Sequence, residues 1–382
     1  MLKGSYQKIF TLIELLVVIA IIAILASMPS TQIKYGSALD LSRYVEPGPA
    51  GKYGQARVSD DGQIEFADRP GIPQYFQGFN WFGFAELTGG GRTKEQQRER
   101  IRTFAGQTHA AGYNMLRPLC LDGYLMMGAK EDMVFNPDHL DHFDYLFSEL
   151  KKRGIYSYLT IAAYRMGYRQ WLLGQEGHGY IKEKMSWGDE VMRKRWETLA
   201  EMLLDHVNPY TKTKYRDDPA VLCVEFYNEQ DLALYNLQKK QNQEIIRWIR
   251  DQFIDELNHT YGQGKFDEKQ VVVSPGEDEP YATDWAKLAR KRLTESHRFC
   301  EQTVRKLGFQ GMVTQANCVQ RLYVSEVAYQ TLSCRSLNVY FCHPRGYTKP
   351  GATCPQNSSA SDGVDYLRQA CAMRVDTSLT LV

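Results

Sequence analysis

The sequence predicts an α/β fold in which parallel strands and helices alternate and close into a (β/α)8 barrel. Short apolar runs that suit strands recur roughly every forty residues, and amphipathic segments of helical periodicity separate them. The run 221–227 has few polar interruptions, as is typical of a parallel strand that is buried on both faces. This spacing is too irregular for a solenoid of fixed repeats and favours a barrel.

The composition is that of a large globular protein. Of the 382 residues, 43% are hydrophobic, and 46 Lys and Arg balance 45 Asp and Glu to a formal net charge of +1. A balanced charge provides no field that would favour nucleic acid as a partner. The eight cysteines form no C-x-x-C pair, so no metal site and no cofactor are expected.

The N-terminal stretch has the features of a membrane or export signal. Two lysines precede the run 10–26, which is apolar except at two positions and has no polar stripe. Phe10 and Glu14 resemble the leader of type IV pilins and pseudopilins, in which cleavage precedes a Phe and a Glu stands five residues into the mature chain. Ile9 replaces the Gly of that pattern. An ordinary signal peptide or an uncleaved anchor is the alternative, and each predicts a secreted or envelope protein that contacts the membrane through this segment.

The rest of the chain can be divided in order. Residues 1–28 are the leader or anchor, 29–56 are a linker marked by Pro and Gly, and 57–382 are the barrel. An Asp-Gly pair within 57–66 predicts a β-hairpin ahead of the barrel. Barrel strands are expected at 75–81, 113–118, 155–163, 221–227, 311–317 and 336–341. Helices are expected at 101–111, 140–150, 192–203, 236–257 and 287–307.

Two polar residues, Asn228 and Glu229, end the fourth expected strand. In a barrel of this kind the carboxyl ends of the strands form the face that carries chemistry. Glu229 is suited there to protonate the leaving oxygen of a glycosidic bond, and Asn228 to hydrogen-bond the sugar hydroxyl beside the reacting carbon. Taken alone, an Asn-Glu pair is more often simply the polar end of a strand.

The surrounding stretch 206–229, HVNPYTKTKYRDDPAVLCVEFYNE, resembles the segment before the acid/base glutamate in cellulase-like enzymes of glycoside hydrolase clan A, especially family 5. Those enzymes have an Asn-Pro-Tyr-Thr turn, an Asp-Asp-Pro before the strand and Asn-Glu at its end. All three stand here in that order. The resemblance covers roughly 57–382 and implies a TIM barrel. It also implies a cellulase- or mannanase-like enzyme that hydrolyses β-linked oligo- or polysaccharides with retention, Glu229 being the acid/base.

Further site residues follow from the same resemblance. Arg117, at the end of the second strand, matches the arginine beneath the nucleophile, where a cation holds a carboxylate charged. The stretch 338–344, NVYFCHP, resembles the family pattern His-x-Tyr-Trp-x-His-Pro, with Tyr340 and His343 matching and Asn338 in place of the first histidine. Tyr340 is either a hydrogen-bond donor to the nucleophile or a half-buried core residue. The residues expected to bind substrate are Asn80, Trp81, Tyr164, Asn317 and His343.

The nucleophile itself has no candidate at the expected place. A retaining glycosidase needs a second carboxylate about 5–5.5 Å from the acid/base. No glutamate follows Tyr340, and 379–382 has the pattern of an opening seventh strand. The sequence therefore predicts a barrel that is incomplete at its C-terminus, with the seventh strand cut short, the eighth missing and the nucleophile lost by truncation.

Two alternatives stay open. A protein that keeps the cleft without the chemistry would be a non-catalytic carbohydrate-binding protein or an inactive fragment. The leader also allows a pseudopilin-like structural protein, but Pro29 and the glycines between 36 and 54 would break the long stem helix that such a protein requires.

Overall fold

Six parallel strands form the central sheet of the computed structural model, which describes residues 32–163, 183–228, 243–276 and 278–318, together with 327, 330–332, 334 and 336–338. Each strand pairs with the next one along the chain, so the order in the sheet repeats the order in the sequence. The strands are β3 (Gly78–Trp81), β4 (Met115–Pro118), β5 (Tyr156–Ala162), β6 (Val221–Asn228), β7 (Met312–Cys318) and β8 (Ser336–Asn338). All six expected strands are confirmed, whereas the seventh, at 379–382, lies outside the described residues.

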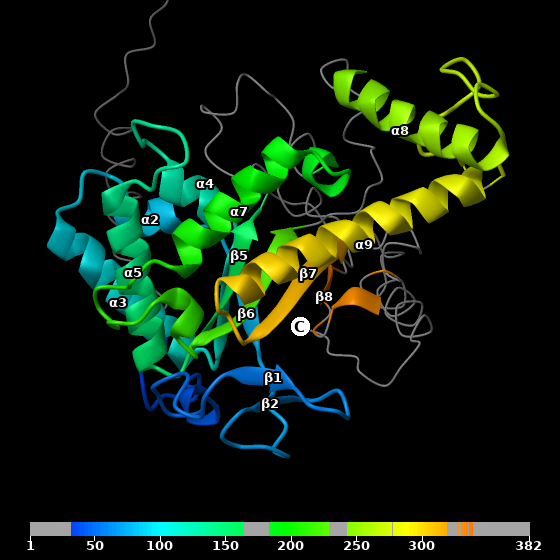
Figure 1. Ribbon diagram of the computed structural model, residues 1–382. Helices are drawn as coiled ribbons and strands as arrows, with labels where there is room; N and C mark the ends of the chain where they lie inside the picture. Colours follow the sequence, from blue (N-terminus) through cyan, green and yellow to red (C-terminus); the bar gives the residue numbers. More distant parts are fainter. Residues whose placement is uncertain are drawn as a thin grey trace, which may run out of the picture.

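Helices connect the successive strands from β3 to β7 and cover the sheet (Figure 1). The long helices are α3 (Lys94–Ala110), α5 (Pro137–Lys152), α7 (Glu190–Leu204), α8 (Gln243–Tyr261) and α9 (Ala282–Lys306). Two short helices, α2 (Phe84–Thr88) and α4 (Leu121–Met126), were not expected, because so few residues display no helical periodicity. No helix in the described part of the chain is long and apolar enough to cross a membrane. The apolar run 10–26 lies outside that part.

The predicted hairpin is formed by β1 (Ala56–Val58) and β2 (Ile64–Phe66), which pair antiparallel. Phe66, the last residue of β2, is buried and stacks on Tyr156, the first residue of β5, with 5.3 Å between the ring centroids. The hairpin therefore lies beneath the amino ends of the barrel strands (Figure 1).

The described part of the predicted linker, 32–55, is irregular apart from the short 3-10 helix η1 (Ser42–Tyr44), and it is hydrogen-bonded to the same lower face. Leu41 N donates to Ala110 O at the end of α3 (2.8 Å), and Ala50 N donates to Lys151 O near the end of α5 (2.8 Å). Gly51 N donates to the hydroxyl of Tyr156 at 3.0 Å. This segment is thus attached to the amino end of the barrel, opposite the carboxyl ends of the strands.

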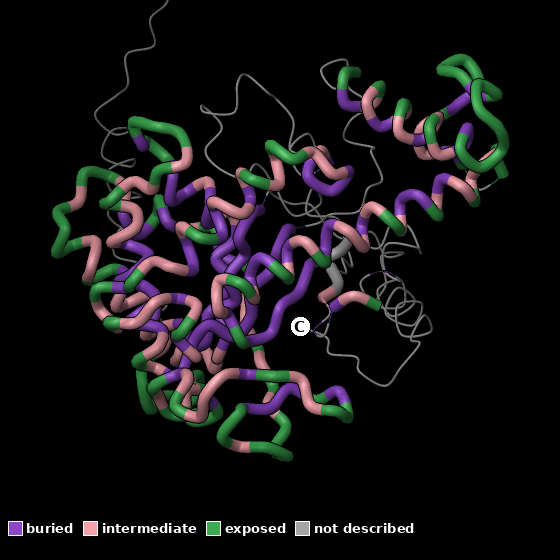
Figure 2. The backbone as a smooth tube through the Cα atoms, viewed as in Figure 1, coloured by how far each residue is buried: buried purple, intermediate pink, exposed green. Residues whose placement is uncertain are grey.

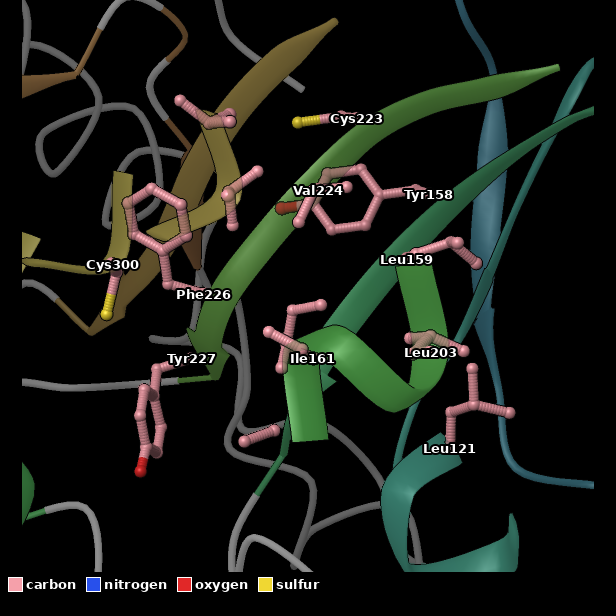
Figure 3. Packing of buried hydrophobic residues seen from close by; sticks show 14 of the residues in the cluster. Leu121, Tyr158, Leu159, Ile161, Leu203, Cys223, Val224, Phe226, Tyr227 and Cys300 are labelled. Carbon is pink, nitrogen blue, oxygen red and sulfur yellow. The ribbon is translucent and has the colours of Figure 1, made fainter. Parts of the chain in front are cut away.

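Strand β6 is the centre of the core. All eight of its residues are buried (Figure 2). The indole Nε1 of Trp196, on α7, donates to Phe226 O at 3.0 Å. Figure 3 shows side chains of β5 and β6 packed among leucines from α4 and α7. Since burying one large apolar side chain contributes about 1.5–3 kcal/mol, this dense packing fixes where β6 ends.

Polar side chains fix the start of β6. Asn208 Oδ1 accepts from Tyr210 N (2.8 Å) and Thr211 N (3.2 Å), which closes the Asn-Pro-Tyr-Thr turn. Asp218 is buried, accepts from Ala220 N at 2.9 Å, and pairs with Lys151 Nζ at 2.7 Å. The sequence motifs that precede the strand therefore have a structural role in placing its amino end.

One stability prediction concerns the start of α3. The Thr93 hydroxyl accepts from Gln96 N, and the Gln96 side chain accepts from Thr93 N, which together form a capping box. We expect Thr93→Ala to lower the free energy of unfolding by about 1 kcal/mol, because helix amides lose an acceptor. Chemical denaturation measures this loss. Thr198→Ala, at a partly exposed interior position of α7, is the matched control, and an equal loss there would contradict the capping argument.

Candidate active site at the carboxyl ends of the strands

A buried ion pair between Arg117 on β4 and Glu225 on β6 forms the centre of the candidate site. Arg117 Nη2 lies 2.7 Å from Glu225 Oε1 and 2.6 Å from Oε2, and Arg117 Nε lies 3.1 Å from Oε2. The hydroxyl of Thr160, on β5, donates to the same carboxylate. Arg117 is 7% exposed and Glu225 is fully buried, so neither charge is solvated and each depends on the other.

The register of the parallel strands explains this cluster. Asn80 stands opposite Arg117 across β3 and β4, and Thr160 stands opposite Glu225 across β5 and β6. Side chains at equal heights on neighbouring parallel strands point to the same side of the sheet. These two pairs therefore bring polar residues from β3, β4, β5 and β6 to one side of the sheet.

Arg117 also binds the oxygens of two amide side chains. Its Nη2 donates to Asn228 Oδ1 at 2.9 Å, and its Nη1 donates to Asn80 Oδ1 at 3.1 Å. Because each oxygen faces the guanidinium, each NH2 group points away from it. Asn228 is 1% exposed, and its Nδ2 has no hydrogen-bond partner among the residues that the structure describes. The last residue of β6 thus presents a buried and oriented donor.

An aromatic ring lies against the guanidinium. The Arg117 Cζ atom is 5.1 Å from the ring centroid of Tyr158, which is buried on β5. Burial raises the pKa of Tyr158 well above its ordinary value, and the nearby Glu225 carboxylate raises that pKa further. The phenol is therefore neutral at physiological pH and gives Arg117 an uncharged, aromatic neighbour.

The predicted substrate-binding residues on β3 point in different directions. Asn80 is exposed and contacts Arg117. Trp81 is 8% exposed and packs toward α2 and α3, with its ring centroid 4.4 Å from that of Phe84 and 4.7 Å from that of Phe104. The exposed aromatic residue at this strand end is Phe82, which the sequence did not single out.

Of the other predicted site residues, only Asn317 lies in the described part of the chain. Asn317 lies in β7, opposite Leu337 of β8. Glu229 follows the last residue of β6 directly in the sequence but lies outside the described residues. The same holds for Tyr164, Tyr340 and His343.

Glu225 was not anticipated as the partner of Arg117. The sequence led us to expect that Arg117 supports a nucleophile near the seventh strand, whereas the carboxylate it binds in the described structure belongs to β6. A signal for this was present, because a charged residue inside a run that is otherwise apolar must find a partner when it is buried. Thr160, a common β-strand residue, gave no such signal.

Comparison with known sequences finds plant relatives of part of the chain. No family model matches. A rice protein (Oryza sativa subsp. japonica), provisionally named mannan endo-1,4-beta-mannosidase 9, is 29% identical over 171 residues, which are 42% of this chain and 39% of that protein. Mannan endo-1,4-beta-mannosidase 4 of the same organism is 24% identical over 183 residues, covering 46% of this chain and 38% of that protein. The alignments thus span about two fifths of the length of these relatives.

Solved structures are similar to this chain over more of its length than these sequences are. The endo-1,4-beta-mannanase from Rhizomucor miehei has a TM-score of 0.51 and 14% identity, over 86% of this chain and 80% of that chain. A glycoside hydrolase family 5 mannosidase from the same organism, solved as a point mutant in complex with mannosyl-fructose, has a TM-score of 0.50 and 13% identity, over 86% of this chain and 72% of that one. These similarities confirm the predicted α/β barrel fold of the chain.

Proposed function

We propose that this protein is a glycoside hydrolase that cleaves β-1,4-linked mannan by a retaining mechanism. The observation that carries the proposal is the oriented amide of Asn228 at the carboxyl end of β6, directly before Glu229 in the sequence. Support also comes from the partial relatives named as mannan endo-1,4-beta-mannosidases and from the fold.

In this proposal Glu229 is the acid/base. It protonates the leaving oxygen while a carboxylate nucleophile bonds to the anomeric carbon, and it then activates the water that displaces this carboxylate. Asn228 donates through Nδ2 to the sugar hydroxyl beside the reacting carbon, a contact that strengthens as the transition state forms. Arg117, Tyr340, Asn80 and the remaining predicted residues position the nucleophile and the sugar. No glutamate stands in 341–382, so the proposal assigns no nucleophile among those residues.

Carbohydrate binding without turnover is a second candidate, since the oriented amide of Asn228 suits the binding of a sugar hydroxyl whether or not a bond is cleaved. The test is to incubate the full chain with mannan and with cellulose, and to measure new reducing ends and the binding of mannopentaose by calorimetry. We expect hydrolysis of mannan with a retained anomer detected by NMR. Binding without products would favour the second candidate, and neither binding nor products would contradict both.

We also propose that the protein works outside the cytoplasm, in the cell envelope or secreted, with the run 10–26 as leader or membrane anchor. The support is the apolar character of this run, in which only two residues are polar, and the lysines before it. Fractionation of expressing cells is expected to find the full chain in membrane or external fractions. Recovery from the cytosol, equal to that of a variant lacking residues 1–28, would contradict this proposal.

The contribution of Asn228 can be tested by removing its amide. We expect Asn228→Ala to lower kcat on mannan by about 10²-fold with a smaller effect on KM, since the lost donor acts mainly in the transition state. Asn258→Ala is the matched control. Asn258 is buried on α8, and among the described residues its side-chain amide hydrogen-bonds only the backbone N–H and C=O of Phe266. An equal loss of activity in both variants would indicate a structural role for Asn228.

A further inference from the structure

We propose that Glu225 is a positioning residue of this site, which acts through Arg117 to set the direction in which Asn228 and Asn80 present their amide donors to substrate. The inference rests on the proposed function for its kinetic consequences. The Glu225 carboxylate itself is fully buried in the middle of β6.

The hydrogen-bond donors of Arg117 are divided between Glu225 and the two amides. The edge formed by Nε and Nη2 faces the Glu225 carboxylate. Nη2 also reaches Asn228 Oδ1, and Nη1 reaches Asn80 Oδ1. Because the guanidinium is planar, its bidentate contact with Glu225 fixes the plane in which the remaining N–H groups point. The orientation of the amides therefore follows from the position of Glu225.

Thr160 holds the other side of the carboxylate. Its hydroxyl donates to Glu225 Oε2, and β5 carries it directly opposite Glu225 in the register. A glutamine at position 225 would keep one acceptor oxygen but turn an NH2 group toward the donors of Arg117 or Thr160. Two donors would then face each other, and Arg117 would seek other acceptors. Asn228 would lose the contact that decides which end of its amide faces outward.

A purely structural role for Glu225 is the competing explanation, since any buried ion pair affects folding when it is broken. Asp218 provides a matched comparison. It is also a fully buried carboxylate that pairs with a cation, Lys151 Nζ at 2.7 Å, but it precedes β6 at the end opposite the candidate site. Asp218→Asn and Glu225→Gln therefore make the same chemical change, one ahead of the amino end of β6 and the other within the strand.

The first test observes the amides directly. In protein labelled with 15N at asparagine, the side-chain NH2 signals of Asn228 and Asn80 are assigned by their loss in the alanine variants. We expect Glu225→Gln to shift both signals, while those of Asn208 and Asn258 stay in place, and we expect Asp218→Asn to leave the Asn228 signal unchanged. An unshifted Asn228 signal in folded Glu225→Gln protein overturns the proposal.

The second test is kinetic. We expect Glu225→Gln to lower kcat on mannan by about 10²-fold, and Asp218→Asn to leave kcat unchanged below its own melting temperature. KM should change less than kcat, because the misdirected amides act mainly in the transition state. A structural role would leave the amide signals in place and would not separate kcat from KM. If kcat and KM of folded Glu225→Gln match those of the wild type, the proposal is wrong.

If the wild-type protein does not hydrolyse mannan, the proposed function fails, and the amide signals alone decide whether Glu225 positions Asn228.

If Glu225→Gln does not fold, Thr160→Val takes its place, since this variant removes one hydrogen-bond donor to Glu225 and keeps the charge. A smaller shift of the Asn228 signal is then expected, and no shift overturns the proposal.

Discussion

Glutamine in place of Glu229 is expected to lower the turnover of mannan by a factor of about 10³, within the range that general acid catalysis contributes. The amide keeps the size and hydrogen-bonding reach of the side chain but has no proton to give to the leaving oxygen. The loss should appear in kcat, because the missing proton transfer takes place in the transition state.

A substrate with a better leaving group separates this role from a loss of binding. An aryl mannoside that releases a stable phenolate needs little protonation, so Glu229→Gln should slow its first cleavage step far less than it slows mannan hydrolysis. Glu268→Gln, at an exposed position in the loop after α8, is the control and should match the wild type. Equal losses on both substrates, or wild-type activity in Glu229→Gln, would contradict the assignment of Glu229 as the acid.

The second large effect is on stability. Arg117→Met removes the cation that pairs with the buried Glu225 carboxylate, and we expect the free energy of unfolding to fall by about 3–5 kcal/mol. The double variant Arg117→Met, Glu225→Leu should recover most of this loss, because apolar side chains of similar volume can replace a buried ion pair. Denaturation in guanidinium chloride measures both. A double variant as unstable as the single one would show that the loss comes from packing and not from the stranded charge.

The pH dependence of the Arg117→Met variant gives an independent check. Without Arg117, burial penalises the charged form of Glu225 and favours its protonated form in the folded state. The loss of unfolding free energy caused by Arg117→Met should therefore be small at an acidic pH where glutamate is protonated in both states, and it should grow as the pH rises toward neutrality. A deficit that is independent of pH would argue against a stranded carboxylate.

The strands were predictable because their signals are local. The run 221–227 is apolar throughout except at Glu225 and is followed by Asn228, and β6 spans Val221–Asn228 in the structure. The hairpin likewise rests on one Asp-Gly turn. By contrast, the contact between Asn80 and Arg117 depends on the register of β3 against β4, which no pattern within either strand specifies.

The site residues likewise divide into those that a local motif predicts and those that depend on contacts between strands. The resemblance to family 5 enzymes placed Arg117 and Asn228 at strand ends, and they lie together in the structure. It did not identify Glu225, because a motif at the end of a strand carries no information about which buried acid balances a charge on another strand. The direction of Trp81 was also missed, since the alternation of side chains along β3 turns its ring toward α2 and α3 once Asn80 faces Arg117.

The attachment of residues 32–55 to the barrel has a geometric consequence for a protein that acts on a polymer. Helix α3 runs antiparallel to the strands, so its end at Ala110, which holds Leu41, lies at the amino ends of the strands. The chain therefore joins the barrel at the pole opposite Arg117 and Asn228. A protein tethered through this pole would turn the proposed catalytic face outward, and a long polysaccharide could lie across that face without meeting the tether.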